Sequence, residues 1–343
     1  KMRMGTGFLT QGSNKRSIAL DLKTAGGRDA LKRLVTDWAD VLIENYRPGA
    51  FKALGLGYEE LARLKPKLIY ASMTAFGQDG PRGTQTAYDH AIQATSGITA
   101  ATGTQASGPI KVGAPVIDYA TGTMGAFAIS AALYQTLRTG QGQYIDMAML
   151  DVALILQSSH VTDYFHSGHA HQRAGNKMRF PETSMHEAAD GLVQLAASNA
   201  RQHRRFYTAI DEPAEAARTT YDERYARYDE KDAMIAAKLK QKTAQEWEDY
   251  LQSKHVPATR VRGLAEALQD PQVGHRAVLH RHDHVPGVEK PLTVPLAAFK
   301  FAHDGPSIER PPPRLGEHTD EVLASVGYSA AEIAALRKAG AAA

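Results

Sequence analysis

The sequence contains no cysteine in its 343 residues. Disulfide bonds, thiolate metal sites and cysteine nucleophiles are therefore excluded. A chain without cysteine is compatible with a reducing compartment, and we expect a cytoplasmic protein. With 43% hydrophobic and 22% charged residues, the composition is that of a globular chain long enough for one large and one smaller domain.

Long apolar runs and a strong charge of one sign are also missing. The nearest apolar run, residues 124–133, is too short to span a bilayer, and residues 1–12 lack the apolar core of a signal peptide. The net charge is only +3, and no dense Lys/Arg run is interleaved with aromatic residues. We therefore expect neither a membrane nor a nucleic acid as partner.

Several sequence motifs of catalysis and metal binding are absent. There is no GxSxG, P-loop or GxGxxG motif, which speaks against a serine hydrolase, a P-loop nucleotidase and a dinucleotide dehydrogenase. Histidines cluster twice, but without a helical HExxH pattern, and convergent ligands are what a metal site needs. We expect no metal site at these clusters, which comprise His166, His169 and His171, and His280, His282 and His284.

The first half of the sequence alternates strand-like and helix-like segments. Residues 17–22, 40–46 and 67–74 read as strands, and residues 25–38, 58–63 and 88–95 read as helices. Such alternation predicts a parallel sheet covered by helices. Ligands of such sheets bind at the carboxyl ends of the strands. The residues that follow those ends are therefore candidate binding residues: Lys23, Asn45, Tyr46 and the Gly77-Gln78 turn.

Asp118 is the leading catalytic candidate. It is expected at the end of the extended residues 113–118 and just before a helix over residues 120–137. The N–H groups of a helix N-terminus can hold a carboxylate or stabilise an oxyanion formed on it, so Asp118 could be a covalent nucleophile. Position alone favours a simple N-cap. Tyr88 and Asp89, after a glycine-containing loop, could orient a substrate or cap a helix.

Read together, the motifs resemble the family III CoA-transferases, the family of the formyl-CoA and carnitine CoA-transferases. The resemblance covers nearly the whole chain. It rests on residues 14–22 (NKRSIALDL), 39–49 (ADVLIENYRPG), 69–80 (IYASMTAFGQDG), 88–97 (YDHAIQATSG), 113–122 (GAPVIDYATG), 139–151 (TGQGQYIDMAMLD) and 312–323 (PPRLGEHTDEVL).

The resemblance implies transfer of CoA from an acyl-CoA to a small carboxylic acid, with CoA as a substrate and no metal. Asp118 falls on the family's catalytic aspartate, which forms an anhydride and then an aspartyl-CoA thioester. Tyr88 and Asp89 match the pair that faces the reacting carboxylate. Lys52 could substitute for a basic residue that many members carry where this chain has Ala53. The implied CoA-site residues are Leu22, Lys23, Asn45, Tyr46, Lys52 and Gly77.

The implied fold is α/β, with a nucleotide-binding-like parallel sheet in a large domain and a smaller α+β middle domain. We expect the large domain in residues 1–170, a linker in 171–185, the small domain in 186–285 and a return to the large domain in 286–343. Two chains of this family form an interlocked homodimer. Members also carry an opening strand-helix-strand segment that this sequence lacks, so we expect the chain to start within a longer protein.

Two other functions remain open. An α-methylacyl-CoA racemase of the same superfamily needs an acid and a base, but Tyr88 stands where racemases place a histidine. A non-catalytic CoA-binding protein is the second alternative. The glycine-run loop of the formyl-CoA transferases has no counterpart between Arg173 and Met185, which argues against oxalate or formate as the acid.

Overall fold

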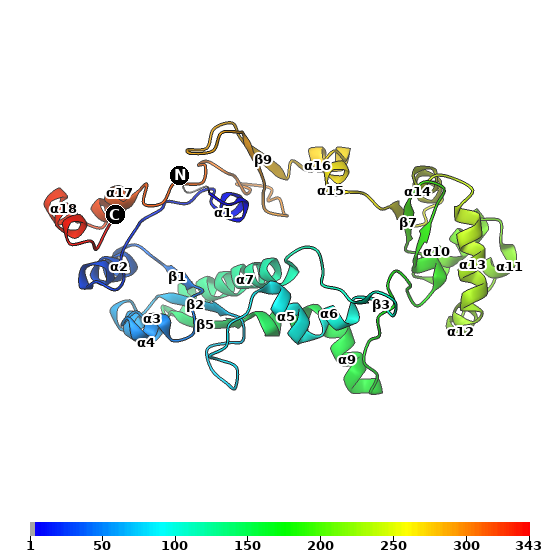
Figure 1. Ribbon diagram of the computed structural model, residues 1–343, viewed down its shortest axis with the longest axis horizontal. Coiled ribbons are helices and arrows are strands. Elements are labelled where there is room, and N and C mark those ends of the chain that lie inside the picture. Colours follow the sequence, from blue (N-terminus) through cyan, green and yellow to red (C-terminus); the bar gives the residue numbers. More distant parts are fainter. Residues whose placement is uncertain (1–3) are drawn as a thin grey trace. The chain divides into compact units, whose positions relative to one another are not determined.

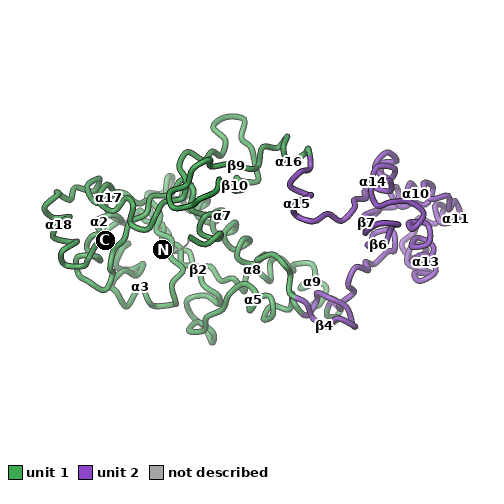
Figure 2. Tube along the Cα trace, turned by 45° about the horizontal axis from the view of Figure 1, so that its top comes forward, with its two compact units in different colours: residues 1–99, 111–170, 271–343 green, residues 100–110, 171–270 purple. Residues whose placement is uncertain are grey.

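The computed structural model describes residues 4–343 and divides into two compact units. The first unit combines residues 1–99, 111–170 and 271–343, and the second combines residues 100–110 and 171–270 (Figure 2). The second unit thus ends earlier than the expected residue 285 and includes a segment from the first half. The reason for the earlier end is that residues 279–295 form a hairpin of the first unit, where His282 is within 3.0 Å of the Ser13 hydroxyl.

A three-stranded parallel sheet lies in the first unit (Figure 1). Its order is β1-β2-β5, with β1 at Val41–Glu44, β2 at Ile69–Thr74 and β5 at Gln143–Ala148. The register aligns Glu44, Ser72 and Asp146 in one row across the sheet. The predicted parallel sheet is confirmed, although it is small.

Helix α7 (Val116–Thr139) packs on the face of this sheet that carries Met73 and Met147. Gly125 makes the close approach possible, because a Cβ there would lie 2.3 Å from the Met73 terminal methyl. On the other face, Tyr70 and Tyr144 pack with Tyr58, and their ring centroids are 5.0–6.1 Å apart. The sheet is therefore covered by apolar side chains on both faces, as a parallel sheet requires.

Helix α7 also corrects an expectation. It is 24 residues long and apolar enough, by length and composition alone, to cross a membrane, whereas the sequence pattern gave only a ten-residue run. Such a helix is weak evidence of a membrane span, since core helices pass the same test. Only 22% of its apolar window is buried in the chain, so much of its apolar surface lacks a partner within the described residues.

Residues 17–22 do not form the predicted strand. Leu20 makes only an isolated bridge with Ala342, and the N–H groups of Ser17 and Ala19 donate to the side chains of His318 and Thr319. The segment is held by the C-terminal part of the chain and not by the sheet. A propensity read from a short window cannot detect such side-chain partners.

The remaining elements of the first unit are mostly short helices around the sheet. Thr24 caps α2, and Ser329 caps the last helix, with Glu332 completing a capping box. The elements are α1 (Thr6–Gln11), α2 (Ala25–Asp37), α3 (Ala50–Ala53), α4 (Tyr58–Leu64), α5 (Asp89–Ser96), α8 (Met149–Leu156), α9 (Ser158–Ser167), α16 (Pro271–Arg276), β9 (Leu279–His282), β10 (Leu292–Pro295), α17 (Thr319–Ser325) and α18 (Ala330–Lys338); α6 (Ile98–Ala101) crosses the division between the units.

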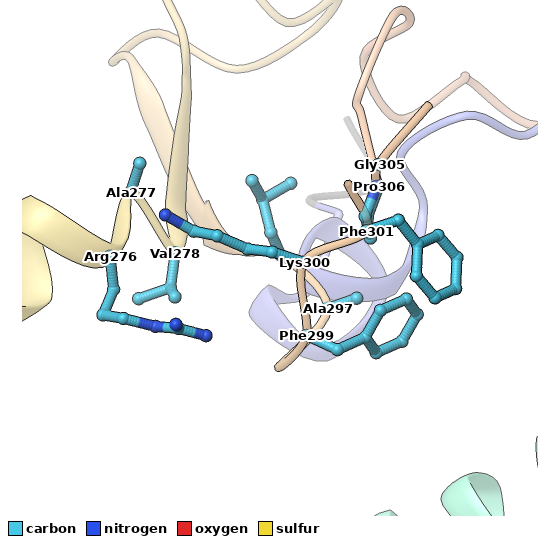
Figure 3. Close-up of a pocket in the computed structure, with 10 residues that line it drawn as sticks. Arg276, Ala277, Val278, Ala297, Phe299, Lys300, Phe301, Gly305 and Pro306 are labelled. Carbon is cyan, nitrogen blue, oxygen red and sulfur yellow. The ribbon is translucent and has the colours of Figure 1, made fainter. Parts of the chain in front are cut away.

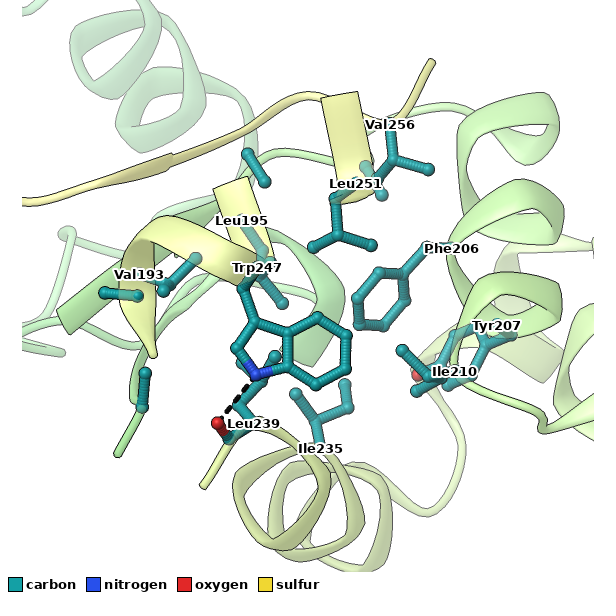
Figure 4. Packing of buried hydrophobic residues seen from close by; sticks show 14 of the residues in the cluster. Val193, Leu195, Phe206, Tyr207, Ile210, Ile235, Leu239, Trp247, Leu251 and Val256 are labelled. Atoms are coloured by element: carbon teal, nitrogen blue, oxygen red, sulfur yellow. Dashed lines mark hydrogen bonds between the residues drawn. The ribbon is translucent and has the colours of Figure 1, made fainter. Parts of the chain in front are cut away.

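The second unit is an α+β body with its own core. Its antiparallel sheet has the order β6-β7-β8, and a turn at Asp190-Gly191 joins β6 to β7. Figure 4 shows Trp247 among aliphatic and aromatic side chains, with its indole N–H donating to the Leu239 carbonyl at 2.7 Å. The elements are β3 (Gly103–Thr104), β4 (Gly108–Pro109), η1 (Pro181–Thr183), β6 (Met185–Glu187), β7 (Leu192–Leu195), α10 (Ala200–Ala209), α11 (Pro213–Ala216), α12 (Tyr221–Tyr225), α13 (Tyr228–Leu239), α14 (Ala244–Ser253), β8 (Ala258–Arg260) and α15 (Leu264–Ala267).

The end of the expected linker belongs to this core. Glu182 in η1 is fully buried and accepts hydrogen bonds from His203 and Arg224 at 2.7 and 3.1 Å. Both ring nitrogens of His203 face acceptors, because Nε2 lies 3.0 Å from the Glu215 carbonyl. A buried carboxylate that is paired in this way fixes η1 to α10 and α12.

Candidate active site

Asp118 lies in the first turn of α7 and not before the helix. The helix begins at Val116 with Pro115 at its N-cap position, four residues earlier than the expected start at residue 120. The Asp118 side chain is exposed, and none of the contacts among the described residues is a hydrogen bond or ion pair to its carboxylate. A carboxylate without a partner at a helix N-terminus is available to react.

Asp89 occupies the N-terminus of α7 from another helix. It is the first residue of α5, is only 7% exposed, and accepts the N–H groups of Ile117 and Asp118 on Oδ2 at 2.7 and 3.1 Å. These two donors are therefore engaged by Asp89. We expected N–H groups at this helix N-terminus to stabilise an oxyanion on Asp118. That expectation is wrong for the N–H groups of Ile117 and Asp118, because the Asp89 carboxylate already accepts their hydrogen bonds.

Gln93 extends this network to a third segment. Its amide donates to Asp89 Oδ1 at 2.5 Å, and its carbonyl oxygen accepts the Val112 N–H at 2.8 Å. Gln93 is 1% exposed. The sequence reading missed this residue. Its spacing of four from Asp89 on a helix was the available signal, since residues i and i+4 lie on the same face.

A pocket of about 350 Å³ opens in front of these residues. It brings together the three predicted catalytic residues, Asp118, Tyr88 and Asp89, and adds the side chains of His90 and Lys111, which the sequence did not single out. Tyr88 is 79% exposed and its ring is nearly parallel to that of His90, with centroids 6.4 Å apart. The volume is within the usual range of small-molecule sites.

The pKa of Asp118 is raised above its ordinary value of 3.8. Partial desolvation is the main cause, the charge of Asp89 adds to it, and His90 acts in the opposite direction. Both causes disfavour the charged form. A carboxylate with a raised pKa is also a more basic nucleophile than an ordinary aspartate.

Candidate CoA-binding residues follow the carboxyl ends of β1 and β2. The Tyr46 ring packs against that of Phe51 in a tilted arrangement with centroids 4.9 Å apart, and the Tyr46 N–H donates to Glu44. Gly77 has φ of 90°, which favours glycine, and the Gln78 N–H donates to Asp146 on β5. The buried Gln78 Nε2 has no hydrogen-bond partner. This edge of the sheet therefore presents an exposed aromatic ring and a tight turn, with the unpaired Gln78 amide buried beside the turn.

The other predicted CoA residues vary in their surroundings. Leu22 packs against the core of the first unit, and the carbonyl groups of Leu22 and Lys23 accept from Arg28 at 3.2 and 2.8 Å. The Lys52 ammonium is 3.9 Å from Glu59, and both side chains are 76% exposed. Asn45 is exposed beside Tyr46. Their role in binding CoA stays a prediction.

A second hollow in the first unit is lined by basic and aromatic side chains. Lys300 and Arg276 lie on either side of Val278, and the rings of Phe299 and Phe301 lie side by side with centroids 4.9 Å apart (Figure 3). No acidic side chain lines it. In the part of the chain that the structure describes, no group of three or more acidic or histidine side chains is arranged to hold a metal ion.

Comparison with known proteins agrees with the resemblance. The model of CoA-transferase family III matches residues 2–319. The succinate–glutarate CoA-transferase of Agrobacterium fabrum is 37% identical over 330 residues, which are 91% of this chain and 78% of that protein. The human succinyl-CoA:glutarate CoA-transferase is 30% identical over 325 residues, 94% of this chain and 74% of that protein.

A solved structure shows the same fold. A CAIB/BAIF family protein from Brucella suis superposes with a TM-score of 0.78 at 31% identity, covering 93% of this chain and 83% of that one. The sequence match and the shared fold both extend over nearly the whole chain. The chain therefore belongs to CoA-transferase family III, whose enzymes transfer coenzyme A between acyl-CoA and carboxylic acids.

Proposed function

We propose that Asp118 is the nucleophile and carries first the acyl group and then CoA. The observation that carries this proposal is the unpaired Asp118 carboxylate at the pocket, with its backbone N–H fixed by the buried Asp89. A nucleophile must be both accessible and held in place. Asp89 is assigned as a positioning residue, because both of its oxygens are already engaged by N–H donors.

The first half of the reaction loads the enzyme. The Asp118 carboxylate attacks the donor thioester carbonyl, a C–O bond forms, and the C–S bond breaks to release the CoA thiolate. This step leaves a mixed anhydride of Asp118 and the donor acid. The thiolate then attacks the Asp118 carbonyl, which releases the donor carboxylate and leaves an aspartyl-CoA thioester. No net proton is transferred.

The second half reverses these steps with another acid. The acceptor carboxylate attacks the aspartyl thioester and expels the thiolate. This step forms a second anhydride, between Asp118 and the acceptor acid. The thiolate then attacks the acceptor carbonyl, giving the new acyl-CoA and free Asp118. Thioester and anhydride are both activated acyl groups, so little free energy is lost at each exchange. Water must be kept from the anhydride while it exists.

Small dicarboxylic acids are the substrates that the relatives favour. The named relatives use succinate and glutarate, and a relative from Acetobacter aceti that is 33% identical over 315 residues is an acetyl-CoA:oxalate CoA-transferase. We assign succinyl-CoA as donor and a dicarboxylate of four or five carbons as acceptor, with CoA lying along the carboxyl edge of the sheet past Tyr46 and Gly77.

The active form that we propose is a homodimer with interlocked chains. Large apolar side chains on α7 are exposed, with Phe127 at 68%, Tyr134 at 63% and Leu137 at 85%. On α9, Phe165 is 83% exposed. Several large exposed apolar side chains on neighbouring turns of one helix are typical of an interface. Light scattering should give twice the chain mass of 37.2 kDa, and mixed tagged and untagged dimers should not exchange subunits without denaturant. A monomer, or rapid exchange, would contradict the interlocked dimer.

The assay of the proposed function is CoA transfer from succinyl-CoA to glutarate. Double-reciprocal plots should be parallel, because a covalent enzyme form separates the two half-reactions. Asp118→Asn should be inactive, with Asp151→Asn, an exposed first-turn aspartate of α8, as the matched control. Absence of transfer to any acid, together with α-proton exchange on a 2-methylacyl-CoA, would favour a racemase. If the protein shows neither CoA transfer nor α-proton exchange, a non-catalytic CoA-binding protein is favoured.

A further inference from the structure

Lys111 is a cation in the Asp118 pocket that the proposed mechanism does not use. It lines the pocket together with His90, Val112 and Gly113. Its side chain is exposed and makes no ion pair with the acidic residues that the structure describes. We propose that Lys111 recognises the second carboxylate of a dicarboxylic acid whose first carboxylate reacts at Asp118. This inference rests on the proposed function, and it assigns the residue that selects the acid.

The backbone beside Lys111 and the backbone of Asp118 are held by one network of hydrogen bonds through Gln93 and Asp89. The Val112 N–H donates to Gln93, Gln93 donates to Asp89, and Asp89 accepts the Asp118 N–H. The backbone N–H groups of Val112 and Asp118 are therefore both held by the buried pair Asp89 and Gln93, which are 7% and 1% exposed. Because both backbone segments are held in place, the separation between the Lys111 ammonium and the Asp118 carboxylate can select diacids of a particular length.

The charges of the pocket change in favour of an anion during the reaction. Asp89 is the only other acid that lines the pocket, and its oxygens are engaged by N–H donors. Once Asp118 carries an acyl group or CoA, its negative charge is gone. Lys111 then supplies a positive charge in the pocket that an incoming acid can meet. The pocket therefore attracts a dianionic acceptor most strongly in the enzyme form in which Asp118 is covalently modified.

CoA itself does not account for this cation. The nucleophile reacts at the sulfur end of CoA, and the uncharged pantetheine arm separates the sulfur from the phosphates. A lysine in the pocket of Asp118 therefore meets the acid and not the phosphates. An alternative role for Lys111, stabilising an oxyanion at Asp118, would act on every acid equally. A role in recognition acts only on acids with a second carboxylate, and this difference can be measured.

The test compares acids with and without the second charge. Wild type, Lys111→Met, Lys111→Arg and Lys67→Met are assayed with succinyl-CoA as donor and either glutarate or valerate, its five-carbon monocarboxylate, as acceptor. Lys67 is an exposed lysine outside the pocket and serves as the matched control. Loss of the charged contact should raise the KM for glutarate about 10- to 100-fold, the range of a charge-assisted hydrogen bond, with kcat nearly kept. The efficiency with valerate should change less than about twofold, and Lys111→Arg should restore most of the glutarate affinity.

The outcomes separate this inference from the proposed function. Equal losses with glutarate and valerate, or no change in the KM for glutarate, would overturn the role of Lys111 while the transferase stands. If wild type transfers no CoA, the proposed function fails. The role of Lys111 is then tested by itself, by calorimetric titration of glutarate into wild type and into Lys111→Met. Weaker glutarate binding by Lys111→Met supports it, and equal binding or no binding overturns it.

Discussion

Asp118 and Asp89 are two carboxylates with different surroundings at one helix N-terminus. Asp89 is buried and accepts N–H groups, whereas Asp118 is exposed and unpaired. The charge of Asp89 raises the pKa of Asp118. The Asp89 carboxylate thus stabilises the local structure, whereas the surroundings of Asp118 disfavour the charged form of its carboxylate. Unfavourable local interactions of this kind are typical of functional residues.

The raised pKa of Asp118 gives a prediction for stability and pH. A carboxyl whose folded pKa lies above its unfolded value stabilises the fold below the unfolded pKa, and this contribution is lost as pH rises through the folded pKa. Asp118→Asn should therefore raise the melting temperature at neutral pH while lowering kcat by at least about 10³-fold. Calorimetric scans at several pH values check this. The difference in melting temperature should vanish below the ordinary pKa of 3.8. A variant that melts lower than wild type at neutral pH would contradict the account.

Asp89→Asn should act on both stability and the pH profile. Loss of a buried helix-capping carboxylate costs about 1–2 kcal/mol of unfolding free energy. Removal of its charge should also lower the pKa of Asp118, so the acid limb of kcat/KM should move to lower pH. Urea unfolding and a pH–rate profile measure the two effects. An unchanged acid limb would show that Asp89 does not act on the nucleophile through its charge.

At the scale of single residues, the sequence identified three residues that line one pocket, but not Gln93 or Lys111 beside them. Asp118, Tyr88 and Asp89 were identified by motif, and all three line one pocket. Gln93 and Lys111 were missed because their importance depends on contacts between segments that lie 19 residues apart. The spacing of four between Asp89 and Gln93 was a local signal, but the contact of Gln93 with Val112 has no local pattern.

Among the elements, α7 connects the sheet to the site. Its start was predicted four residues too late, because its first N–H groups are satisfied by Asp89, 28 and 29 residues away, and not by a local cap. Strands β1 and β2 were predicted from the short apolar runs over residues 40–46 and 67–74. The expected strand over residues 17–22 was wrong, since its backbone partners are side chains near residue 318.

The packing of α7 depends on the size of residue 125. Gly125→Ala needs only a shift of the flexible end of Met73, so its effect on unfolding free energy should be small. Gly125→Leu has no space between α7 and the sheet and should cost about 1–3 kcal/mol. Denaturant unfolding of the two variants checks this, with kcat as a second measure of how well Asp118 is positioned. Equal stability of the Ala and Leu variants would contradict the close packing.

At the scale of the whole molecule, each unit has its own core. The sequence predicted a large α/β part and a smaller α+β part in the middle of the chain. It did not indicate that residues 100–110 belong with the second unit, where the Gly175 N–H donates to the Gly103 carbonyl at 2.7 Å. This link between distant segments depends on the folded chain and on no motif.

The second unit should be sensitive to acid through Glu182. Burial alone would raise the pKa of Glu182, but hydrogen bonds and charge from His203, together with Arg224, hold it below its ordinary value of 4.5. The stability that this gives is present above pH 4.5 and is lost as pH falls through the lower folded pKa. Glu182→Gln should cost about 3–5 kcal/mol and remove this pH dependence.

The two tryptophans allow this effect to be assigned to the second unit. Trp247 is in its core, and Trp38 is in the first unit, so a Trp38→Phe background leaves fluorescence from Trp247 alone. Glu187→Gln is the matched control, because the Glu187–Lys240 pair is exposed and contributes little. Equal unfolding of the Glu182 and Glu187 variants would contradict the role of the buried network.

The covalent intermediate on Asp118 is the central claim, and trapping it is the most direct test. Full-length protein is mixed with succinyl-CoA, treated with hydroxylamine or borohydride, and mapped by peptide mass spectrometry. We predict a modification on the peptide that contains Asp118, formed in wild type and in Asp151→Asn but not in Asp118→Asn. A modification on another residue, or none while CoA transfer proceeds, would contradict the account.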